Sequence, residues 1–280
     1  MCRLALLAAV CLFAAAAPAE EPVDPVKAKH EKAISKARAA YQDELEKFDA
    51  AATKHFDAAE AAARKKGDKT AVDTIKRERL ACGLLGAVPK SAPATLGQKV
   101  TTASAALTGA YETAVKEYTK ARKDDLAGEA QKKLTALKKD GGRFFLLVNR
   151  QTGRIAAAEK EDGARGSPLV QTEHAGKPNQ HWSFVATADP LVFHVRNRAS
   201  GHFFNIGGTV KDKTPLILWD GGGGTHNTFI AARTGAHYTF MNTDSKKFVC
   251  GAPEADKWVV NQQEKPADEE HLWSLVPLVP

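Results

Sequence analysis

The sequence predicts an α+β protein with two segregated domains: a long N-terminal helical hairpin of coiled-coil type over residues 24–140, and an all-β domain of three repeats over residues 142–280. Two observations lead to this prediction. First, the stretch around Trp182 returns in altered form around Phe229 and Trp273, at intervals of 47 and 44 residues, and a fixed period in this range marks a repeated supersecondary unit. Second, the N-terminal half is rich in Ala, Lys and Glu, lacks Trp, and spaces its apolar residues as a long helix does.

A secretory signal peptide is expected at residues 1–19. One early cation, Arg3, precedes a run of Ala, Leu, Val and Phe, and Ala17-Pro18-Ala19 has the small-x-small pattern of a cleavage site. The apolar run is shorter than the ~20 residues that span a bilayer, so no membrane span is predicted. We therefore expect a secreted or periplasmic protein whose mature chain begins near Glu20.

Two long helices joined by a short one are expected in the N-terminal domain. The first begins at about Asp24 and ends at Gly67-Asp68, a short helix follows over residues 69–81, and a loop with two Gly and two Pro covers residues 83–93. The second long helix is expected over residues 96–137. The stripe of the first helix advances in steps of three, four and seven residues, through Ile34, Tyr41, Leu45, Phe48, Ala52, Phe56 and Ala59.

Two such helices can fold back on each other as an antiparallel hairpin. Ala-rich seams bury little area per residue, so the hairpin is expected to need further helices from another copy, which predicts a homo-oligomer through the helical region. Gly141-Gly142 then ends the helical part, because glycine terminates a helix at little cost, and the two domains are expected to fold separately.

The charge distribution argues against a nucleic-acid partner. The formal net charge is +7, and residues 20–141 hold 24 Lys and Arg against 19 Asp and Glu, but the two signs alternate along the helices. Nucleic-acid arms are usually unbroken cationic blocks, so no nucleic-acid partner is predicted.

Loss of the signal peptide leaves Cys82 and Cys250, which are expected as buried free thiols. The alternative, a disulfide between the domains, would require their Cα atoms to lie ~5.5 Å apart.

A second landmark runs through the three repeats. An Asn opens each one, 33, 32 and 31 residues before its closing aromatic, at Asn149, Asn197 and Asn242. Each copy holds two short apolar runs bounded by turn residues, a pattern typical of strands. The closing aromatics are expected to fill a shared core. The expected repeats cover about residues 142–188, 189–235 and 236–280.

Three repeats of this length, each with about four strands and a closing motif like Gln-x-Trp, resemble the ricin B-chain lectin family, whose fold is the β-trefoil. The resemblance covers residues 142–280, and the motif is intact once, at Gln180 and Trp182. It implies a shallow sugar pocket in each repeat, made of an acidic residue after the first apolar run, an aromatic residue at the end of the second, and an Asn/Gln pair at the closing motif. An aromatic face packs on the C–H face of a pyranose while polar groups bind its hydroxyls.

Carried onto this chain, the resemblance leaves one usable pocket, in the second repeat. Asn205 takes the acidic position, Trp219 the aromatic one and His226-Asn227 the closing pair, with Asp220 beside the tryptophan. These five residues are the candidate carbohydrate-binding residues. The amide of Asn205 is a poorer acceptor than a carboxylate, so the alternative is that Trp219 is an ordinary strand residue of a degenerate copy.

The other two pockets are expected to be disabled. In the first repeat, Ala157 and Thr172 take the acidic and aromatic positions, although Asn179 and Gln180 keep the closing pair and remain weaker candidates. In the third repeat, Trp258 is the one residue that could offer a shifted platform. The matching positions there are Cys250, Gln262 and the pair Glu270-His271.

The predicted function is therefore that of an exported, non-enzymatic carbohydrate-binding protein whose partner is a glycan or polysaccharide, with an oligomeric stalk that raises avidity. The alternative is a degenerate trefoil that serves as a structural or protein-interaction module of the cell envelope. The chain has no catalytic serine motif, phosphate loop, dinucleotide fingerprint or zinc motif, and its nine His lack the short spacing of a metal site. No catalytic residue, metal or cofactor is predicted.

Overall fold

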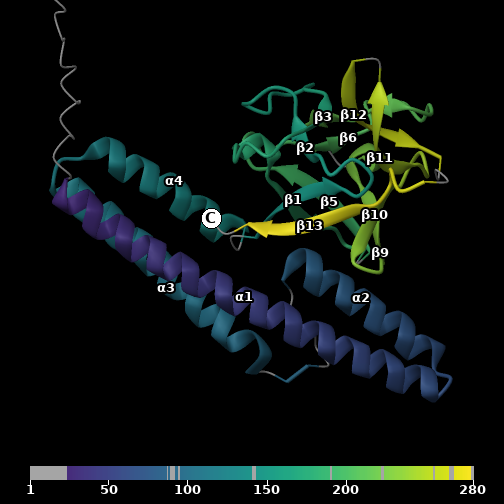
Figure 1. Cartoon of the computed structure of the whole chain (residues 1–280), viewed down its shortest axis with the longest axis horizontal. Helices are drawn as coiled ribbons and strands as arrows, with labels where there is room; N and C mark the ends of the chain where they lie inside the picture. The colour runs from purple at the N-terminus through teal and green to yellow at the C-terminus, as the bar shows by residue number, and fades with distance from the viewer. Residues whose placement is uncertain are drawn as a thin grey trace, which may run out of the picture.

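The computed structural model describes residues 24–86, 88, 92–93, 95–140, 143–189, 191–221, 224–254, 256–264 and 268–278. The expected signal peptide at residues 1–19 and the Gly141-Gly142 boundary lie outside the described residues. The chain forms an elongated helical part followed by an all-β part that sits on one side of it (Figure 1). The helices are α1 (Pro25–Lys65), α2 (Lys69–Leu85), α3 (Thr95–Lys120) and α4 (Asp124–Asp140).

Helices α1 and α3 form the expected antiparallel hairpin. Asp24 caps α1, its Oδ1 accepting from the backbone N–H of Val26 at 3.0 Å and that of Lys27 at 3.3 Å, which satisfies two of the donors that a helix start leaves free. The predicted stripe of α1 is the face that packs, and the hairpin core joins it to apolar residues of α3. That core includes Tyr41, Leu45, Leu107, Tyr111 and Tyr118.

The second long helix, expected as one piece over residues 96–137, is two helices, and that expectation was wrong. Arg122 adopts a left-handed conformation, with φ 56°, and the N–H of Lys123 donates to the carbonyl of Tyr118 at 2.9 Å, the geometry of a helix C-terminus. Asp124 and Asp125 then open α4, where their negative charge faces the positive end of the helix dipole. The chain therefore reverses direction at this point.

Helix α4 packs back against α3 and supplies a third helix from within the same chain. Its apolar face is buried against the hairpin, through Ala127, Ala130, Leu134 and Leu137. The side chain of Lys123, in the turn before α4, forms an ion pair with the capping residue Asp24 and so joins this turn to the start of α1. The covering helix that the sequence assigned to another copy is thus present in one chain.

Helix α2 connects the two halves. It continues to Leu85, so Gly83 lies inside the helix and not in the loop expected over residues 83–93; the helix ends at Gly86, whose φ is +70°. Leu80 and Leu84, 4% and 1% exposed, belong to the same buried cluster as the core of the β domain. The expectation of separate folding did not foresee this shared core.

A closed ring of six strands forms the β domain. Strand β1 pairs with β4, β4 with β5, β5 with β9, β9 with β10, β10 with β13, and β13 with β1, all antiparallel. These strands are β1 (Phe144–Asn149), β4 (Trp182–Ala186), β5 (Val192–Asn197), β9 (Phe229–Thr234), β10 (His237–Asn242) and β13 (Trp273–Leu278).

Three hairpins cap this barrel, one from each repeat. They contact one another through pairings between β3 and β12, between β7 and β12, and through a bridge from Pro168 to Ile217. Six barrel strands with three capping hairpins make the β-trefoil, as expected. The hairpin strands are β2 (Ile155–Ala158) with β3 (Leu169–Thr172), β6 (Phe203–Asn205) with β7 (Thr214–Pro215) and β8 (Ile217–Trp219), and β11 (Phe248–Glu254) with β12 (Lys257–Gln263).

The closing aromatics fill the core as predicted: Trp182 and Phe229 are 0% exposed and Trp273 is 1% exposed. The two tryptophans make equivalent hydrogen bonds, since each indole Nε1 donates to a strand carbonyl of its own repeat, at Ala156 (2.8 Å) and Val249 (2.9 Å). The aromatic residues that recur at the repeat period are therefore core residues that stabilise the fold.

The three opening asparagines join consecutive repeats into a ring. Each is fully buried, and its Nδ2 donates to a backbone carbonyl in the closing turn of the preceding repeat: Asn149 to Glu270 at 2.7 Å, Asn197 to Asn179 at 3.0 Å, and Asn242 to His226 at 3.2 Å. Because Asn149 of the first repeat bonds to Glu270 of the third, these hydrogen bonds link the three repeats in a closed ring.

Cys82 and Cys250 are both free and buried in the structure. Burial raises the pKa of the Cys82 thiol to about 11 and raises the pKa of Cys250 as well, so both stay protonated at neutral pH. They behave as small apolar residues of the two domains.

Candidate functional site

A hollow of about 480 Å³ lies on the second repeat, and all five residues chosen from the sequence line it. Asn205 comes from the end of β6, Trp219 from the end of β8 with Asp220 directly after it, and His226-Asn227 from the short 3-10 helix η2 (Thr225–Asn227). The rest of the lining is Gly207, Gly208, Ile217 and Gly224. Residues spread over 23 positions of the chain therefore meet around one opening.

Trp219 forms the aromatic side of the hollow. It is 37% exposed, one of four large apolar side chains that stand out from the surface within the described residues. The guanidinium carbon of Arg165 lies 3.9 Å from the centroid of the ring, so a cation from the first repeat packs on one face of the indole. No sequence pattern pairs these two residues, because only the contact between the capping hairpins brings them together.

Asp220 is held by two basic side chains. Its Oδ2 lies 3.2 Å from Nε of Arg165, and its Oδ1 lies 3.2 Å from Nδ1 of His202. Half of the Asp220 side chain remains exposed at the rim of the hollow. The carboxylate is therefore positioned while its remaining acceptor capacity faces solvent.

Asn205 presents a different group from the carboxylate that the family pattern implies. Its Oδ1 accepts from the backbone N–H of Gly207 at 2.7 Å, which fixes the amide in a local turn. Gly207 and Gly208 follow with φ +67° and +72°, a left-handed pair that a side chain would strain. The amide NH₂ of Asn205 is a donor, which a carboxylate lacks, so the hydrogen-bond pattern at this position is altered.

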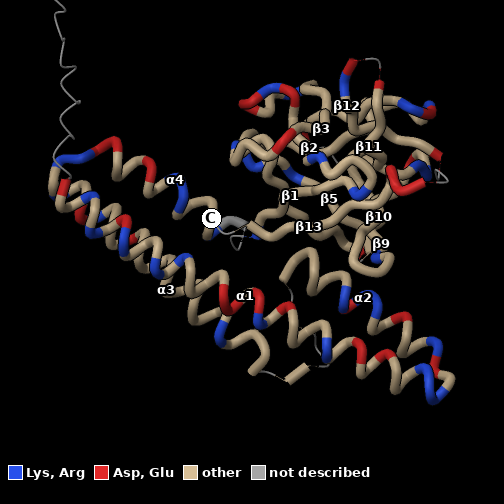
Figure 2. Tube along the Cα trace, in the orientation of Figure 1, with Lys and Arg blue, Asp and Glu red and all other residues tan. Residues whose placement is uncertain are grey.

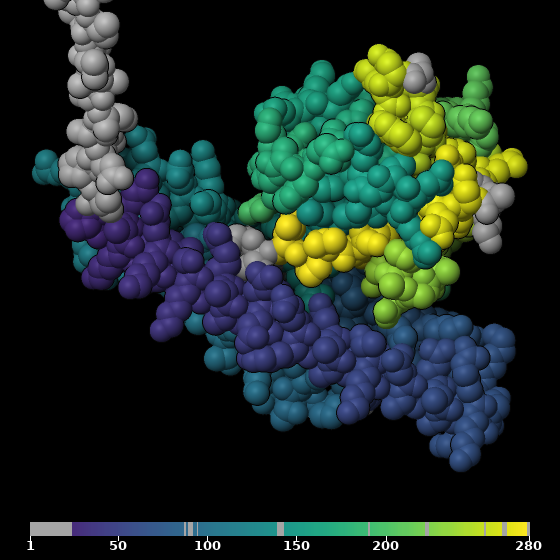
Figure 3. Space-filling view, viewed as in Figure 1, coloured from purple at the N-terminus to yellow at the C-terminus, as the bar shows by residue number. Residues whose placement is uncertain are grey.

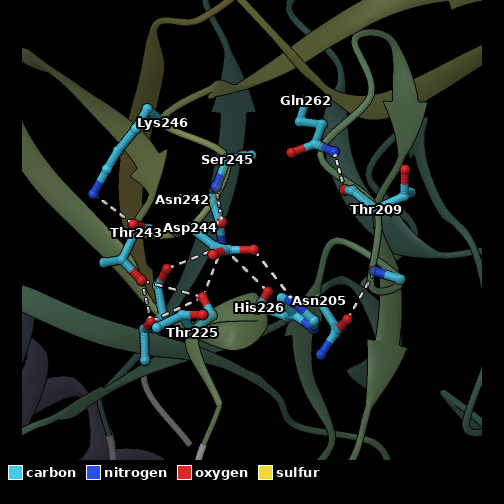
Figure 4. Close-up of polar contacts among 12 residues, drawn as sticks. Asn205, Thr209, Thr225, His226, Asn242, Thr243, Asp244, Ser245, Lys246 and Gln262 are labelled. Carbon is cyan, nitrogen blue, oxygen red and sulfur yellow. Dashed lines mark hydrogen bonds and ion pairs between the residues drawn. The ribbon is translucent and has the colours of Figure 1, made fainter.

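The third repeat positions the closing pair of the second. Nε2 of His226 lies 3.3 Å from Oδ2 of Asp244, and Figure 4 shows His226 between Asp244 and Asn205. Asn242 Nδ2 donates to the carbonyls of Thr225 and Thr228, at 3.2 and 3.1 Å, on either side of the pair. The hollow thus depends on all three repeats: Arg165 from the first, the lining from the second, and the Asn242–Asp244 loop from the third.

Asn179 and Gln180, the weaker candidates, lie in the 3-10 helix η1 (Pro178–Gln180) and are 7% and 3% exposed. Asn179 Nδ2 donates to the carbonyl of Ala158 at 2.7 Å. Gln180 donates to Thr172 Oγ1 at 2.9 Å and to the carbonyl of Glu173 at 2.6 Å, and accepts from the N–H of Ala175 at 2.9 Å. Their hydrogen bonds hold the turn, and the structure does not bring them into the repeat-two hollow.

The aromatic position of the third repeat also serves the interior. Gln262 is 1% exposed and its Nε2 donates to the carbonyls of Thr209 and Lys211, at 2.7 and 3.1 Å, which ties the third repeat to the second (Figure 4). Trp258, considered as a shifted platform, is half-buried, and the guanidinium carbon of Arg154 lies 5.5 Å from its ring centroid. It does not line the repeat-two hollow.

Among the described residues, no group of three or more His, Cys, Asp or Glu side chains is placed to hold a metal ion. Within the same part of the chain, no helix is both long enough and apolar enough to cross a membrane.

Comparison with protein families matches residues 132–219 to a model described as "Ricin-type beta-trefoil lectin domain-like". The match runs from the last turns of α4 to the end of β8, through the first repeat and most of the second. A search of curated proteins finds no match.

Several solved structures are similar to part of this chain. A designed three-fold symmetric protein, ThreeFoil, is 22% identical, with 48% of this chain and 99% of that chain covered and a TM-score of 0.46. A Polyporus squamosus lectin, solved with a human-type influenza-binding epitope, is 15% identical over 47% of this chain and 48% of that one, with a TM-score of 0.43. An exo-beta-1,3-galactanase from Clostridium thermocellum is 20% identical over 49% and 30%, with a TM-score of 0.45.

The chain thus spans nearly all of the designed protein but about half of the lectin and less than a third of the galactanase. These comparisons cover 48%, 47% and 49% of this chain, respectively. The six-stranded barrel with three capping hairpins makes the C-terminal half of this protein a β-trefoil, and residues 132–219 of the chain match the ricin-type β-trefoil lectin-like family model.

Proposed function

We propose that this protein binds carbohydrate without acting on it, through one site in the second trefoil repeat formed by Asn205, Trp219, Asp220, His226 and Asn227. The observation that carries the proposal is the single hollow of about 480 Å³ that these five residues line together. Its volume falls within the ~300–1,000 Å³ that small-ligand sites occupy.

The hollow offers the two kinds of contact that a sugar ring needs. The partly exposed indole of Trp219 provides an apolar surface for the C–H face of a pyranose. Asp220 provides acceptors for neighbouring hydroxyls, and the Asn205 amide and the His226 ring add polar groups across the opening. A glycan or polysaccharide chain is the partner that fits this combination.

A binding role is favoured over catalysis by the acids that reach the hollow. Glycoside hydrolysis ordinarily uses two carboxyl groups on opposite sides of the bond that breaks. Asp220 is the one carboxylate among the residues that line the hollow in the described part of the chain, and it is engaged by Arg165 and His202. The protein is therefore proposed to hold sugar, not to cleave it.

A second function, a structural or protein-interaction module of the cell envelope, is favoured by the fate of the other two pockets. Gln180 in the first repeat and Gln262 in the third donate to groups within the domain and are buried. If the second repeat had also lost its sugar pocket, the trefoil would serve only as a rigid body on the helices. The binding experiment below separates the two functions.

Export and self-association complete the proposal. An N-terminal signal peptide would place the protein in a periplasm or outside the cell, which N-terminal sequencing of the secreted form tests. A homo-oligomer through the helical region would raise the avidity of a weak single site. Sedimentation of the full chain tests it, and a monomer at micromolar concentration would refute it.

The decisive experiment titrates the full chain with a panel of mono- and oligosaccharides by isothermal calorimetry, beside Trp219→Ala and the matched control Trp258→Ala. Both variants remove a tryptophan outside the closed core, and only Trp219 lines the hollow. We expect at least a fivefold loss for Trp219→Ala and less than a twofold change for the control, because stacking of a ring on an aromatic side chain contributes about 1–3 kcal/mol where it has been measured for nucleic-acid bases. Equal losses would mean that the sugar does not bind specifically at the repeat-two hollow, and no binding by the folded wild type would favour the structural module.

A further inference from the structure

A second hollow, of about 620 Å³, lies where α1, α2 and the turn between β9 and β10 meet. We propose that this interdomain cleft binds an acidic oligosaccharide through its carboxylate or sulfate groups. The cleft shares no lining residue with the repeat-two hollow, so the proposal goes beyond the site above and does not depend on it. Five cations line it: Arg64, Lys76, Arg77, Arg79 and Arg233.

The orientation of α2 brings Lys76 and Arg77 to the wall of the cleft opposite β9. Asp73, Lys76, Arg77 and Leu80 follow one another at the i, i+3, i+4 and i+7 spacing of a single helix face. Leu80 is buried in the trefoil core, which fixes the rotation of α2 about its axis. Figure 3 shows the light-green β9–β10 segment resting against the blue α2, and Figure 2 shows Lys and Arg on α2 below β9.

Positive charge in the cleft is only partly compensated. The two acids of the lining already have partners, because Glu60 pairs with Arg64 at 2.6 Å and Asp73 pairs with Lys69 at 2.7 Å. Lys76 and Arg77 are exposed, and neither takes part in the ion pairs found among the described residues. The pKa of Asp73 is lowered mainly by its hydrogen bond to Lys69, with smaller contributions from the charges of Lys76 and Arg77. A concave surface with an excess of one charge and apolar walls concentrates ligands of the opposite charge.

Arg79 is the best-fixed of the cations. Its side chain is 17% exposed, its guanidinium carbon lies 5.5 Å from the centroid of the Phe56 ring, and it forms an ion pair with Asp57. Its Nε is buried and has no hydrogen-bond partner in the described structure. On the opposite wall, Arg233 Nε donates to the carbonyl of Gly235 at 2.9 Å, which anchors that side chain at the β9–β10 turn.

The chemistry of the walls points to an acidic sugar chain. Arg side chains bind carboxylate and sulfate oxygens through paired hydrogen bonds, and here they come from three separate elements, an arrangement that suits anions spaced along one molecule. The lining also includes Leu191, Ile230 and Ala231, which offer an apolar surface for the C–H faces of the sugar rings. A single small anion would use neither the spacing nor the apolar wall.

The test uses the full chain and tetragalacturonate, titrated by calorimetry at low salt, with neutral maltotetraose as the uncharged comparison. The test variant is Lys76→Ala/Arg77→Ala, which removes two exposed cations of the cleft. The control variant is Lys116→Ala/Lys132→Ala, which removes the same charge from exposed positions on α3 and α4. We expect the cleft variant to weaken tetragalacturonate binding at least tenfold and the control to change it less than twofold.

Three results would overturn the proposal. They are the absence of tetragalacturonate binding to the folded wild type, equal losses in the two double variants, and displacement of tetragalacturonate by inorganic phosphate at similar concentration, which would indicate a simple anion site. Binding to vesicles of anionic lipid in place of the oligosaccharide would also count against it. Trp219→Ala should leave tetragalacturonate binding unchanged, so failure of the repeat-two site and failure of the cleft are separate outcomes.

Discussion

The guanidinium carbon of Arg165 lies 3.9 Å from the ring centroid of Trp219, and this contact joins the first repeat to the hollow of the second. The same guanidinium reaches Asp220 at 3.2 Å, so one residue outside the second repeat orients both its aromatic platform and its acid. Arg165 and Trp219 are held in register because the N–H of Gly166 donates to the carbonyl of Leu218 at 2.7 Å. The site is therefore a property of the assembled trefoil, and an isolated repeat would not contain it.

Replacing Arg165 should weaken sugar binding while leaving the fold intact. Arg165→Ala removes the contact that orients the indole and frees Asp220, so we expect the Kd of any sugar that binds at Trp219 to rise roughly fivefold, which is about 1 kcal/mol. Arg154→Ala is the matched control, because Arg154 packs on Trp258 away from the hollow. Calorimetric titration compares the two, and an unchanged Kd for Arg165→Ala would show that the platform needs no support from the first repeat.

The sequence identified the parts of this site that lie at the pocket positions of the family. Asn205, Trp219 and the His226-Asn227 pair were chosen because the resemblance to the ricin-type family places its pocket positions on them, and the structure brings them to one hollow. Arg165, His202 and Asp244 were missed because they lie at none of these positions: each reaches the site by hydrogen bonds or ion pairs that form only when the strands and hairpins assemble. No local pattern at Arg165 distinguishes it from other loop cations.

In the helical half too, residues at regular spacing were predicted correctly, and features without such spacing were missed. The heptad stripe predicted the buried face of α1, because amphipathic spacing reports burial whatever the partner. The break at Arg122 was missed because a left-handed arginine is an uncommon helix end that composition does not mark. Gly83 was misassigned to a loop because glycine usually interrupts a helix, whereas here it makes room for the trefoil.

Gly83 should resist replacement only while Tyr238 keeps its hydroxyl. A Cβ at Gly83 would lie 2.7 Å from the Tyr238 oxygen but 3.8 Å from the ring carbon that carries it. Gly83→Ala should therefore be neutral or destabilising alone, and in a Tyr238→Phe background it should stabilise by about 0.5–1 kcal/mol through helix propensity. Urea unfolding of the two single variants and the double variant measures this coupling. Additive effects would contradict the close approach of α2 to β10.

Replacing Lys246 with glycine should stabilise the folded protein. It has φ 59°, and the equivalent residues of the first and second repeats are Gly153 and Gly201, with φ +68° and +79°. Lys246→Gly removes the strain of a side chain in this conformation, for an expected gain of about 1 kcal/mol in the free energy of unfolding, despite loss of an exposed hydrogen bond to the Thr243 carbonyl. Thermal unfolding measures the gain, and Gly201→Ala should lower stability by a similar amount. A loss of stability in Lys246→Gly would mean that the exposed hydrogen bond outweighs the strain.

His181 should make the protein sensitive to mild acid. Burial, with smaller effects from Arg198 and His174, lowers the pKa of His181 from 6.5 to about 4, and its Nδ1 lies 3.2 Å from Nη1 of Arg198, placed to accept. Between these two pH values the unfolded chain takes up a proton that the folded chain does not, so the free energy of unfolding falls as pH drops below about 6.5 and stops falling near 4. The contribution of this one group is at most about 3 kcal/mol.

His181→Gln keeps an acceptor near Arg198 but cannot take up that proton. Its free energy of unfolding should therefore fall less than that of the wild type between pH 7 and pH 4.5, by about 2 kcal/mol, even if the variant is less stable at pH 7. His174→Gln, which removes an exposed imidazole, should follow the wild-type slope. Urea unfolding at several pH values measures all three slopes. Parallel slopes for the wild type and His181→Gln would show that the buried imidazole is protonated in the folded protein, with Arg198 displaced from it.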